Sequence, residues 1–213
     1  MLKLHDYGPS QNAWKVRTLL SHLNLSYETV TTSIFEGGSH TTAFLEMNPA
    51  GAVPVLEVGP GRHIAESNAI LCYLAEDTRY LPAEPFARAK VLQWLFFEQD
   101  YIQPSIATLR HWTMTGKLAR RSPDQVNPRR AAAASTLAAL ERHLQSCDYL
   151  ASNSYSIADI AVFAYSHRAE EGGCDVSGYP AFRAWVERVA SRPEGLPPVI
   201  PYSADPHSVK ELH

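Results

Sequence analysis

The sequence has few cysteines and no pattern that would pair them. Only three occur in 213 residues, Cys72, Cys147 and Cys174, and no two of them form a Cys-x-x-Cys motif. Such isolated thiols argue against a disulfide framework and against a zinc site. The sequence therefore predicts a protein of the reducing cytoplasm that needs no metal.

The chain also lacks long apolar segments and a strong excess of charge. No apolar run reaches the roughly 18 residues that suggest a membrane span, and MLKLHDYGPS at the N-terminus has no signal-peptide core. The net charge of −3 offers little attraction to nucleic acid or an anionic membrane. With 45% hydrophobic and 19% charged residues, the composition is that of a soluble globular protein with one or two domains.

The most informative stretch is NPAGAVPVLEVGPGRHIAES at 48–67. It predicts a turn, an apolar strand, a hairpin turn, a second strand and the start of a helix. Proline donates no ladder hydrogen bond, so Pro54 within the strand predicts a cis bond after Val53. The peptide groups of Val53 would then be available to an extended ligand. Glu66 and Ser67 stand at a helix N-terminus, which favours carboxylates.

The segments PAG at 49–51, VPVL at 53–56 and ES at 66–67 together resemble the glutathione-binding half of the glutathione S-transferase family. A plain ββα unit with a capped helix would use the same residues without a ligand. The resemblance implies an α/β + all-α fold. A thioredoxin-like N-terminal domain (βαβ-α-ββα) would be followed by an all-helical C-terminal domain.

The domain limits follow from turn residues in DTRYLPAEP at 77–85, which predict a linker. The glutathione-binding domain is then expected at 1–78. The all-helical domain is expected at 86–213, ending in an extended or loosely docked, proline-rich tail. Apolar spacing predicts a long helix from Phe86 towards Met114, kinked at Pro104.

Two polar residues lie where the first strand, 2–7, gives way to the first helix. Ser10 can cap that helix through its hydroxyl, or the hydroxyl can donate to a thiol. The resemblance implies the second, catalytic role, because theta-like members place a hydroxyl at this turn against the glutathione sulfur. In nu-like members an asparagine two residues later shares the contact, and this sequence has Asn12 there. Both assignments remain open.

The resemblance also implies the remaining contacts to glutathione. The backbone of Val53 would pair with the cysteinyl residue, Ser67 would hold the glutamyl carboxylate, and Glu66 would hold the amine. His40 would reach the glycyl carboxylate, although a lone histidine in a loop is also an ordinary solvated side chain. Ala52 departs from the family pattern, because many relatives carry Lys, Arg or Gln there.

Two further residues are implied by the resemblance in the helical domain. Asp100 would reach across a homodimer to the glutamyl amine of the neighbouring site. Arg110 would face the active-site cleft and hold an anion or an electron-poor substrate, although a solvated arginine is the plainer interpretation. Ser156 and Asp159 form a capping box before an apolar run, so Asp159 is expected to cap a helix rather than act as a base.

The implied function is conjugation of the glutathione thiolate to small electrophiles, a detoxification reaction, by a cytoplasmic homodimer. A nu-like glutathione-dependent disulfide reductase is the alternative, and it needs no protein cysteine. A non-catalytic glutathione-binding protein with the same fold is the third interpretation.

Overall fold

The computed structural model describes residues 1–212, which form two compact units. The first unit comprises Met1–Glu76 together with the tail from Leu196, and the helical unit comprises Asp77–Gly195. The boundary after Glu76 lies close to the predicted one at 78. The tail corrects the prediction, because it belongs to the first unit and not to the helical domain.

The first unit is built on a four-stranded mixed sheet with the order β2-β1-β3-β4. Its strands are β1 (Leu2–Asp6), β2 (Tyr27–Thr31), β3 (Val55–Gly59) and β4 (Arg62–Ala65). Strand β1 runs parallel to β2 and antiparallel to β3, and β3 runs antiparallel to β4. The predicted βαβ unit and the predicted hairpin are both present, so the first unit has the thioredoxin-like order of elements.

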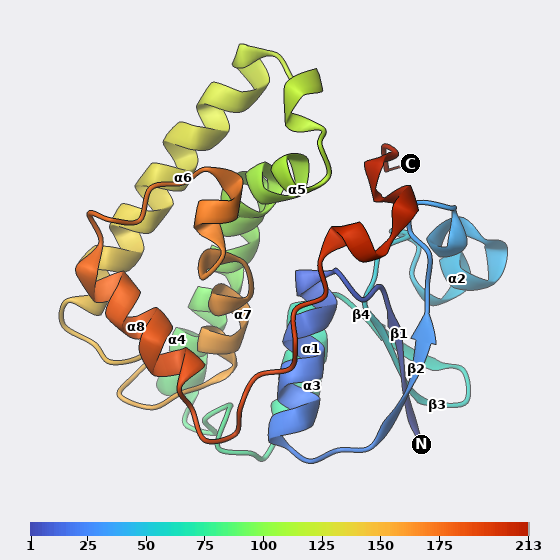
Figure 1. Ribbon diagram of the computed structural model, residues 1–213. Helices are drawn as coiled ribbons and strands as arrows, with labels where there is room; N and C mark the ends of the chain where they lie inside the picture. The colour runs from blue at the N-terminus through green and yellow to red at the C-terminus, as the bar shows by residue number, and fades with distance from the viewer. Residues whose placement is uncertain (213) are drawn as a thin grey trace. The chain divides into compact units, whose positions relative to one another are not determined.

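Two helices pack on one face of this sheet, and a third lies on the other side (Figure 1). The helical segments between Met1 and Glu76 are α1 (Gln11–His22), η1 (Gly38–His40), α2 (Thr42–Met47) and α3 (Ser67–Ala75). The apolar residues spaced along α1, including Val16 and Leu20, are fully buried, as are Leu4 and Leu56 of the sheet and Ile70 of α3. This helical periodicity places α1 and α3 side by side on the core.

The predicted cis peptide bond between Val53 and Pro54 is present. Strand β3 begins only at Val55, so the proline precedes the strand instead of lying inside it. The peptide groups of Val53 therefore lie outside the sheet ladder, beside the turn that starts at Asn48.

The tail folds over the first unit, through the short helices η5 (Tyr202–Ala204) and η6 (Pro206–Val209). The hydroxyl of Tyr7 donates to Asp205 Oδ2 at 2.8 Å. Tyr202 packs with Tyr7 and Phe35 in a small buried cluster, against which Val53 also packs. The expected extended, loosely docked tail is thus a packed part of the first unit (red in Figure 1).

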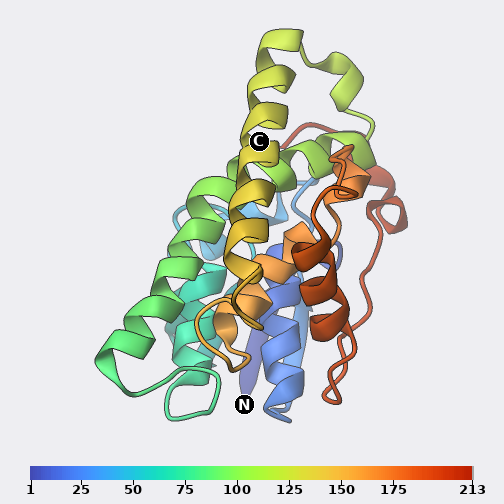
Figure 2. The ribbon, with the colours of Figure 1, turned by 90° about the vertical axis from the view of Figure 1, so that its left-hand side faces the viewer.

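The helical unit contains α-, π- and 3₁₀-helical segments (Figure 2). They are α4 (Pro85–Phe97), η2 (Glu98–Ala107), α5 (Thr108–Met114), η3 (Leu118–Arg120), α6 (Pro123–Leu144), α7 (Ile157–Ser166), η4 (Ala169–Gly172) and α8 (Pro180–Ala190). Every residue of α7 is buried, and α7 packs against α4, η2 and α8. It is therefore the core helix of this unit.

The predicted long helix is continuous from α4 through η2 to α5, but its middle part is a π-helix that contains Pro104. Proline supplies no N–H to the helix, and wider π turns are a usual way to absorb such an interruption. Helix α6 begins at Pro123, with Ser122 as its N-cap, and Pro128 lies inside it. Within residues 1–212, none of the helices combines the length and apolar character of a membrane span.

Asp159 caps α7, as predicted, and also connects it to its neighbours. Its carboxylate accepts hydrogen bonds from the backbone N–H groups of Ser156 and Leu150 and from Trp185 Nε1, each at 3.0 Å. The residue is fully buried, and this burial raises the pKa of its carboxyl group to about 6. The Asp159 carboxylate thus accepts hydrogen bonds from N–H groups at the start of α7, in the preceding loop and on α8.

We expect Asp159→Ala to lower the free energy of unfolding by about 3 kcal/mol or more, because it leaves three buried N–H donors without an acceptor. Denaturant unfolding monitored by circular dichroism measures this loss. The exposed Asp175, which caps only a local turn, provides the control, and Asp175→Ala should cost under about 1 kcal/mol. An Asp159→Ala protein of normal stability that had lost its chemistry would make Asp159 a functional residue instead.

Candidate functional site

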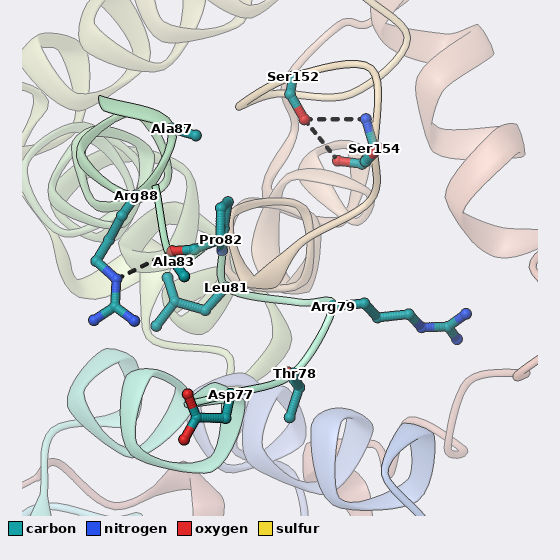
Figure 3. Close-up of a pocket in the computed structure, with 10 residues that line it drawn as sticks. All are labelled: Asp77, Thr78, Arg79, Leu81, Pro82, Ala83, Ala87, Arg88, Ser152 and Ser154. Atoms are coloured by element: carbon teal, nitrogen blue, oxygen red, sulfur yellow. Dashed lines mark hydrogen bonds between the residues drawn. The ribbon is translucent and has the colours of Figure 1, made fainter. Parts of the chain in front are cut away.

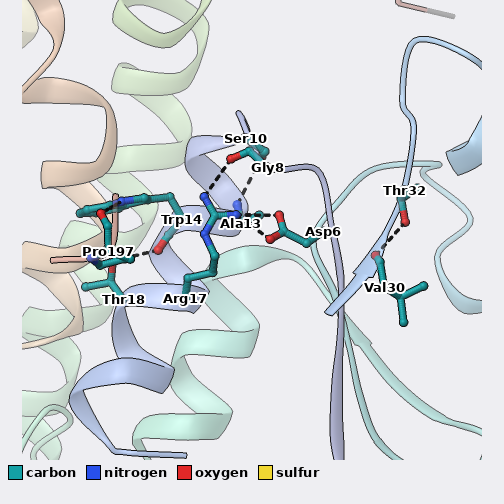
Figure 4. A network of polar contacts seen from close by, with 10 residues as sticks. All are labelled: Asp6, Gly8, Ser10, Ala13, Trp14, Arg17, Thr18, Val30, Thr32 and Pro197. Carbon is teal, nitrogen blue, oxygen red and sulfur yellow. Dashed lines mark hydrogen bonds and ion pairs between the residues drawn. The ribbon is translucent and has the colours of Figure 1, made fainter. Parts of the chain in front are cut away.

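The loop that carries Ser10 is held by a buried ion pair at the end of β1. Arg17 of α1 donates from Nη1 to both carboxylate oxygens of Asp6, at 2.8 and 2.6 Å, and from Nη2 to the carbonyl of Gly8 at 2.9 Å (Figure 4). Burial raises the pKa of Asp6, and the charge of Arg17 opposes that rise. The strand end and the helix start are therefore fixed relative to each other.

Ser10 is the N-cap of α1, as one of its two interpretations predicted. Its Oγ accepts a hydrogen bond from the backbone N–H of Ala13 at 3.3 Å (Figure 4). A hydroxyl that accepts a hydrogen bond still has its own proton to donate. Capping the helix and donating to a thiolate are therefore compatible roles for Ser10.

The start of α3 is joined to the start of α1 through Ser67. The Ser67 hydroxyl donates to Asn12 Oδ1 at 3.3 Å and accepts from Lys15 Nζ at 3.3 Å. Lys15 Nζ also lies 3.5 Å from Asn68 Oδ1. Two helix N-termini, both favourable to anions, thus meet around one buried hydroxyl.

Glu66 immediately precedes this buried hydroxyl and has an unusual backbone. It is the N-cap of α3 with φ of +66°, a region that residues other than glycine rarely occupy. Its side chain is exposed. Strained backbone of this kind gathers at functional sites, and here it directs Glu66 into solvent beside Ser67.

His40 lies beside the turn that leads to Val53. A Cβ at Gly51 would lie 2.9 Å from His40 Nε2, and Gly51 has φ of +62°, so only glycine suits this turn. The ring Nδ1 is 3.1 Å from Ser39 Oγ, and the turn is fixed by Asn48, whose Nδ2 donates to the carbonyl of Ala52 at 2.8 Å. The structure therefore places His40 and the Val53 backbone along the same loop region of the first unit.

The two residues expected from the helical domain have different surroundings. Asp100 is exposed on η2. Arg110 on α5 is only 1% exposed, and its Nε donates to Glu171 Oε2 at 2.7 Å, while Arg168 binds the same carboxylate. Arg110 is therefore not a solvated side chain, and its guanidinium already binds Glu171. An anionic substrate would compete with Glu171 for this guanidinium.

The sequence interpretation missed Lys15, Arg17 and the tail. Lys15 is fully buried in α1, a helix buried over most of its surface, and its neighbours Trp14 and Val16 are also buried. The only sequence signal was that Lys15 lies between the apolar residues Trp14 and Val16. Trp14 Nε1 donates to the carbonyl of Pro197 at 2.9 Å (Figure 4), a contact between residues 183 positions apart that no local pattern indicates.

A separate pocket of about 590 Å³ lies in the helical unit, lined mainly by 77–88 and by Ser152 and Ser154. Figure 3 shows the Arg79 and Arg88 side chains pointing in different directions, so they do not converge on one anion. Within residues 1–212, no group of three or more His, Cys, Asp or Glu is placed to hold a metal ion. The polar groups near Ser10 and Ser67 therefore remain the better candidate site.

Family models match both parts of the chain. Residues 1–76 match the model described as the N-terminal domain of glutathione S-transferase, and residues 104–193 match the model of its C-terminal domain. The chain belongs to the glutathione S-transferase family. The resemblance found in the sequence and the expected two-domain fold are both confirmed.

Individual proteins are similar to this chain over most of their length. Disulfide-bond oxidoreductase YfcG of Escherichia coli K12 is 28% identical over 194 residues, covering 88% of this chain and 89% of that protein. A glutathione S-transferase structure from Pseudomonas fluorescens Pf-5 is 41% identical, with a TM-score of 0.88, covering 92% of this chain and 98% of that one. Another family member from that strain, solved with two glutathione bound, is 26% identical, with a TM-score of 0.79, covering 91% and 89%.

The family resemblance implies that the Ser67 hydroxyl binds the glutamyl carboxylate, so we expect Ser67→Ala to weaken glutathione binding by about 1.5–3 kcal/mol, the size of a hydrogen bond to a charged group. Calorimetric titration of both proteins measures the difference. Ser21→Ala, which changes an exposed serine of α1, is the control and should bind as the wild type does. Equal affinities for wild type and Ser67→Ala would contradict the assigned site.

Proposed function

We propose that this protein is a glutathione transferase that conjugates the thiolate of glutathione to small electrophilic substrates. The observation that carries the proposal is the meeting of two helix N-termini around Ser67, with Ser10 on the loop before one of them. Helix N-termini stabilise negative charge, so these two would stabilise the glutamyl carboxylate and the ionised thiol of bound glutathione.

The catalytic task in this proposal is to ionise the thiol. A free thiol has a pKa of about 8.5, and lowering it by about two units needs about 2.7 kcal/mol of preferential stabilisation of the anion. A hydrogen bond to a charged acceptor contributes about 1.5–3 kcal/mol, and a helix N-terminus adds about 0.3–1 kcal/mol. The free energies of stabilisation expected from the Ser10 hydroxyl and from the N-terminus of α1 together reach the value needed to lower the thiol pKa by about two units.

The rest of glutathione would be held by groups of the first unit. Ser67 and its backbone N–H would bind the glutamyl carboxylate, and Glu66 would bind the amine. The cysteinyl residue would pair with the backbone of Val53, which lies outside the sheet ladder. His40 would reach the glycyl carboxylate, without help from residue 52, which is an alanine. Asp100 of a second subunit would complete the glutamyl site.

Disulfide reduction is the second candidate function, and Asn12 is the observation that favours it. Its amide is half-buried two residues after Ser10 and accepts the Ser67 hydroxyl proton. A glutamyl carboxylate would compete for that proton, and the Asn12 amide would then be released to turn towards the sulfur. The similarity to the disulfide-bond oxidoreductase of E. coli supports this alternative.

We also predict that the protein is a homodimer. Large aromatic side chains are exposed along α4 and η2, with Phe86, Phe96 and Tyr101 between 55% and 73% exposed. Association would remove this apolar surface from water and bring Asp100 to a second subunit. Light scattering at micromolar concentration should give twice the 23.6 kDa mass of the chain, whereas a monomeric mass would contradict the dimer.

The decisive test of the chemistry compares Ser10→Ala with Asn12→Ala. If Ser10 donates to the thiolate, Ser10→Ala should raise the pKa of bound glutathione and slow conjugation at neutral pH. Asn12→Ala removes a hydrogen-bond partner of Ser67, so it should weaken the binding of glutathione but leave the thiol pKa unchanged. Thiolate absorbance of the bound complex, followed against pH, measures the pKa without the natural substrate.

The opposite result would favour the second function. A thiol pKa that rises in Asn12→Ala but not in Ser10→Ala, with disulfide reduction faster than conjugation, would make the protein a disulfide reductase. A normal thiol pKa in the wild-type complex and no turnover in either assay would contradict both enzymatic proposals.

A further inference from the structure

Lys15 is a buried cation directly behind the proposed glutamyl site. Its side chain is fully buried in the first unit, and its Nζ lies 3.3 Å from the Ser67 hydroxyl and 3.5 Å from Asn68 Oδ1. Both oxygens belong to the first turn of α3. The ammonium group therefore adds a full positive charge to a helix N-terminus that already favours anions.

The Lys15 amine donates to the Ser67 oxygen, so the hydroxyl proton of Ser67 points away from Lys15 and is donated to Asn12 Oδ1. A donor polarised in this way forms a stronger hydrogen bond to a charged acceptor.

We propose that Lys15 is a positioning residue that makes the site selective for thiols carrying the α-carboxylate of a γ-glutamyl group. It acts through Ser67: it orients the hydroxyl towards the carboxylate and supplies the charge that balances it. This inference rests on the proposed function, because it assumes that glutathione binds at the start of α3.

The proposal makes the effect of Lys15 depend on one functional group of the ligand. A charge one hydrogen bond behind Ser67 interacts with a carboxylate on that hydroxyl and much less with the distant glycyl end. A purely structural lysine would instead affect every ligand of the site to the same extent. Ligands that differ in single groups therefore separate the two roles.

The test measures the affinity of wild type and Lys15→Met for three thiols by calorimetry. Glutathione has every group, γ-glutamylcysteine lacks the glycine, and 4-aminobutanoyl-cysteinylglycine lacks only the α-carboxylate. Lys15→Met should lower the affinity for glutathione and for γ-glutamylcysteine by about 10- to 100-fold. It should lower the affinity for 4-aminobutanoyl-cysteinylglycine by less than about threefold. Lys15→Arg, which keeps the charge, should preserve the preference for the α-carboxylate.

Lys3→Met makes the same substitution at a part-exposed lysine of β1 that pairs with Glu57, and it should change none of the affinities. Equal losses for all three thiols in Lys15→Met would overturn the inference and leave Lys15 a structural residue. Failure of the wild type to bind glutathione would instead overturn the proposed function itself.

A measurement on the wild type covers the case in which Lys15→Met does not fold. In protein labelled with ¹⁵N at lysine, the Lys15 Nζ resonance, assigned with Lys15→Arg, should shift on binding glutathione or γ-glutamylcysteine. It should shift far less with 4-aminobutanoyl-cysteinylglycine. The same shift with all three thiols would contradict a role for Lys15 at the α-carboxylate.

Discussion

The hydrogen bonds of Ser67 join the two helices on which the candidate site depends. Through Asn12 and Lys15, its hydroxyl connects the first turns of α1 to the first residue of α3. The residues proposed for the sulfur and those proposed for the glutamyl group therefore belong to one connected set of polar side chains. A change at Asn12 or Lys15 on α1 is therefore expected to reach the glutamyl group through Ser67 on α3.

Two other contacts keep this arrangement in place within the first unit. Arg17 ties α1 to the end of β1 through Asp6 and Gly8, and so fixes the loop that carries Ser10. The tail adds a second constraint, because Tyr202 packs on Tyr7 beside Val53. Segments more than 140 residues apart in the sequence thus meet close to the proposed cysteinyl contact.

Local signals in the sequence predicted much of the fold. The cis bond before Pro54, the hairpin of β3 and β4, the cap at Ser10 and the capping box at Asp159 each depend on a few neighbouring residues, and the structure contains all of them. The family resemblance, carried by three short segments near 49–67, is likewise confirmed by the models that match both parts of the chain.

The remaining features depend on partners distant in sequence. Burial of Lys15 requires α3, burial of Arg110 requires Glu171 from another segment, and docking of the tail requires Tyr7. Residue type alone favours exposure for lysine, arginine and a proline-rich tail, and no local pattern in the sequence indicates that these are buried. The ligand-binding and catalytic roles assigned to all the candidate site residues stay predictions; these residues are Ser10, Asn12, His40, Val53, Glu66, Ser67, Asp100 and Arg110.

The central claim is that glutathione binds across the starts of α1 and α3 in the first unit. A crystal structure of the complex with glutathione tests it most directly. The account predicts the glutamyl carboxylate on the Ser67 hydroxyl, the cysteinyl residue paired with Val53, and the sulfur within hydrogen-bond distance of Ser10 or Asn12. Glutathione bound elsewhere, or with its sulfur directed away from both residues, would contradict it.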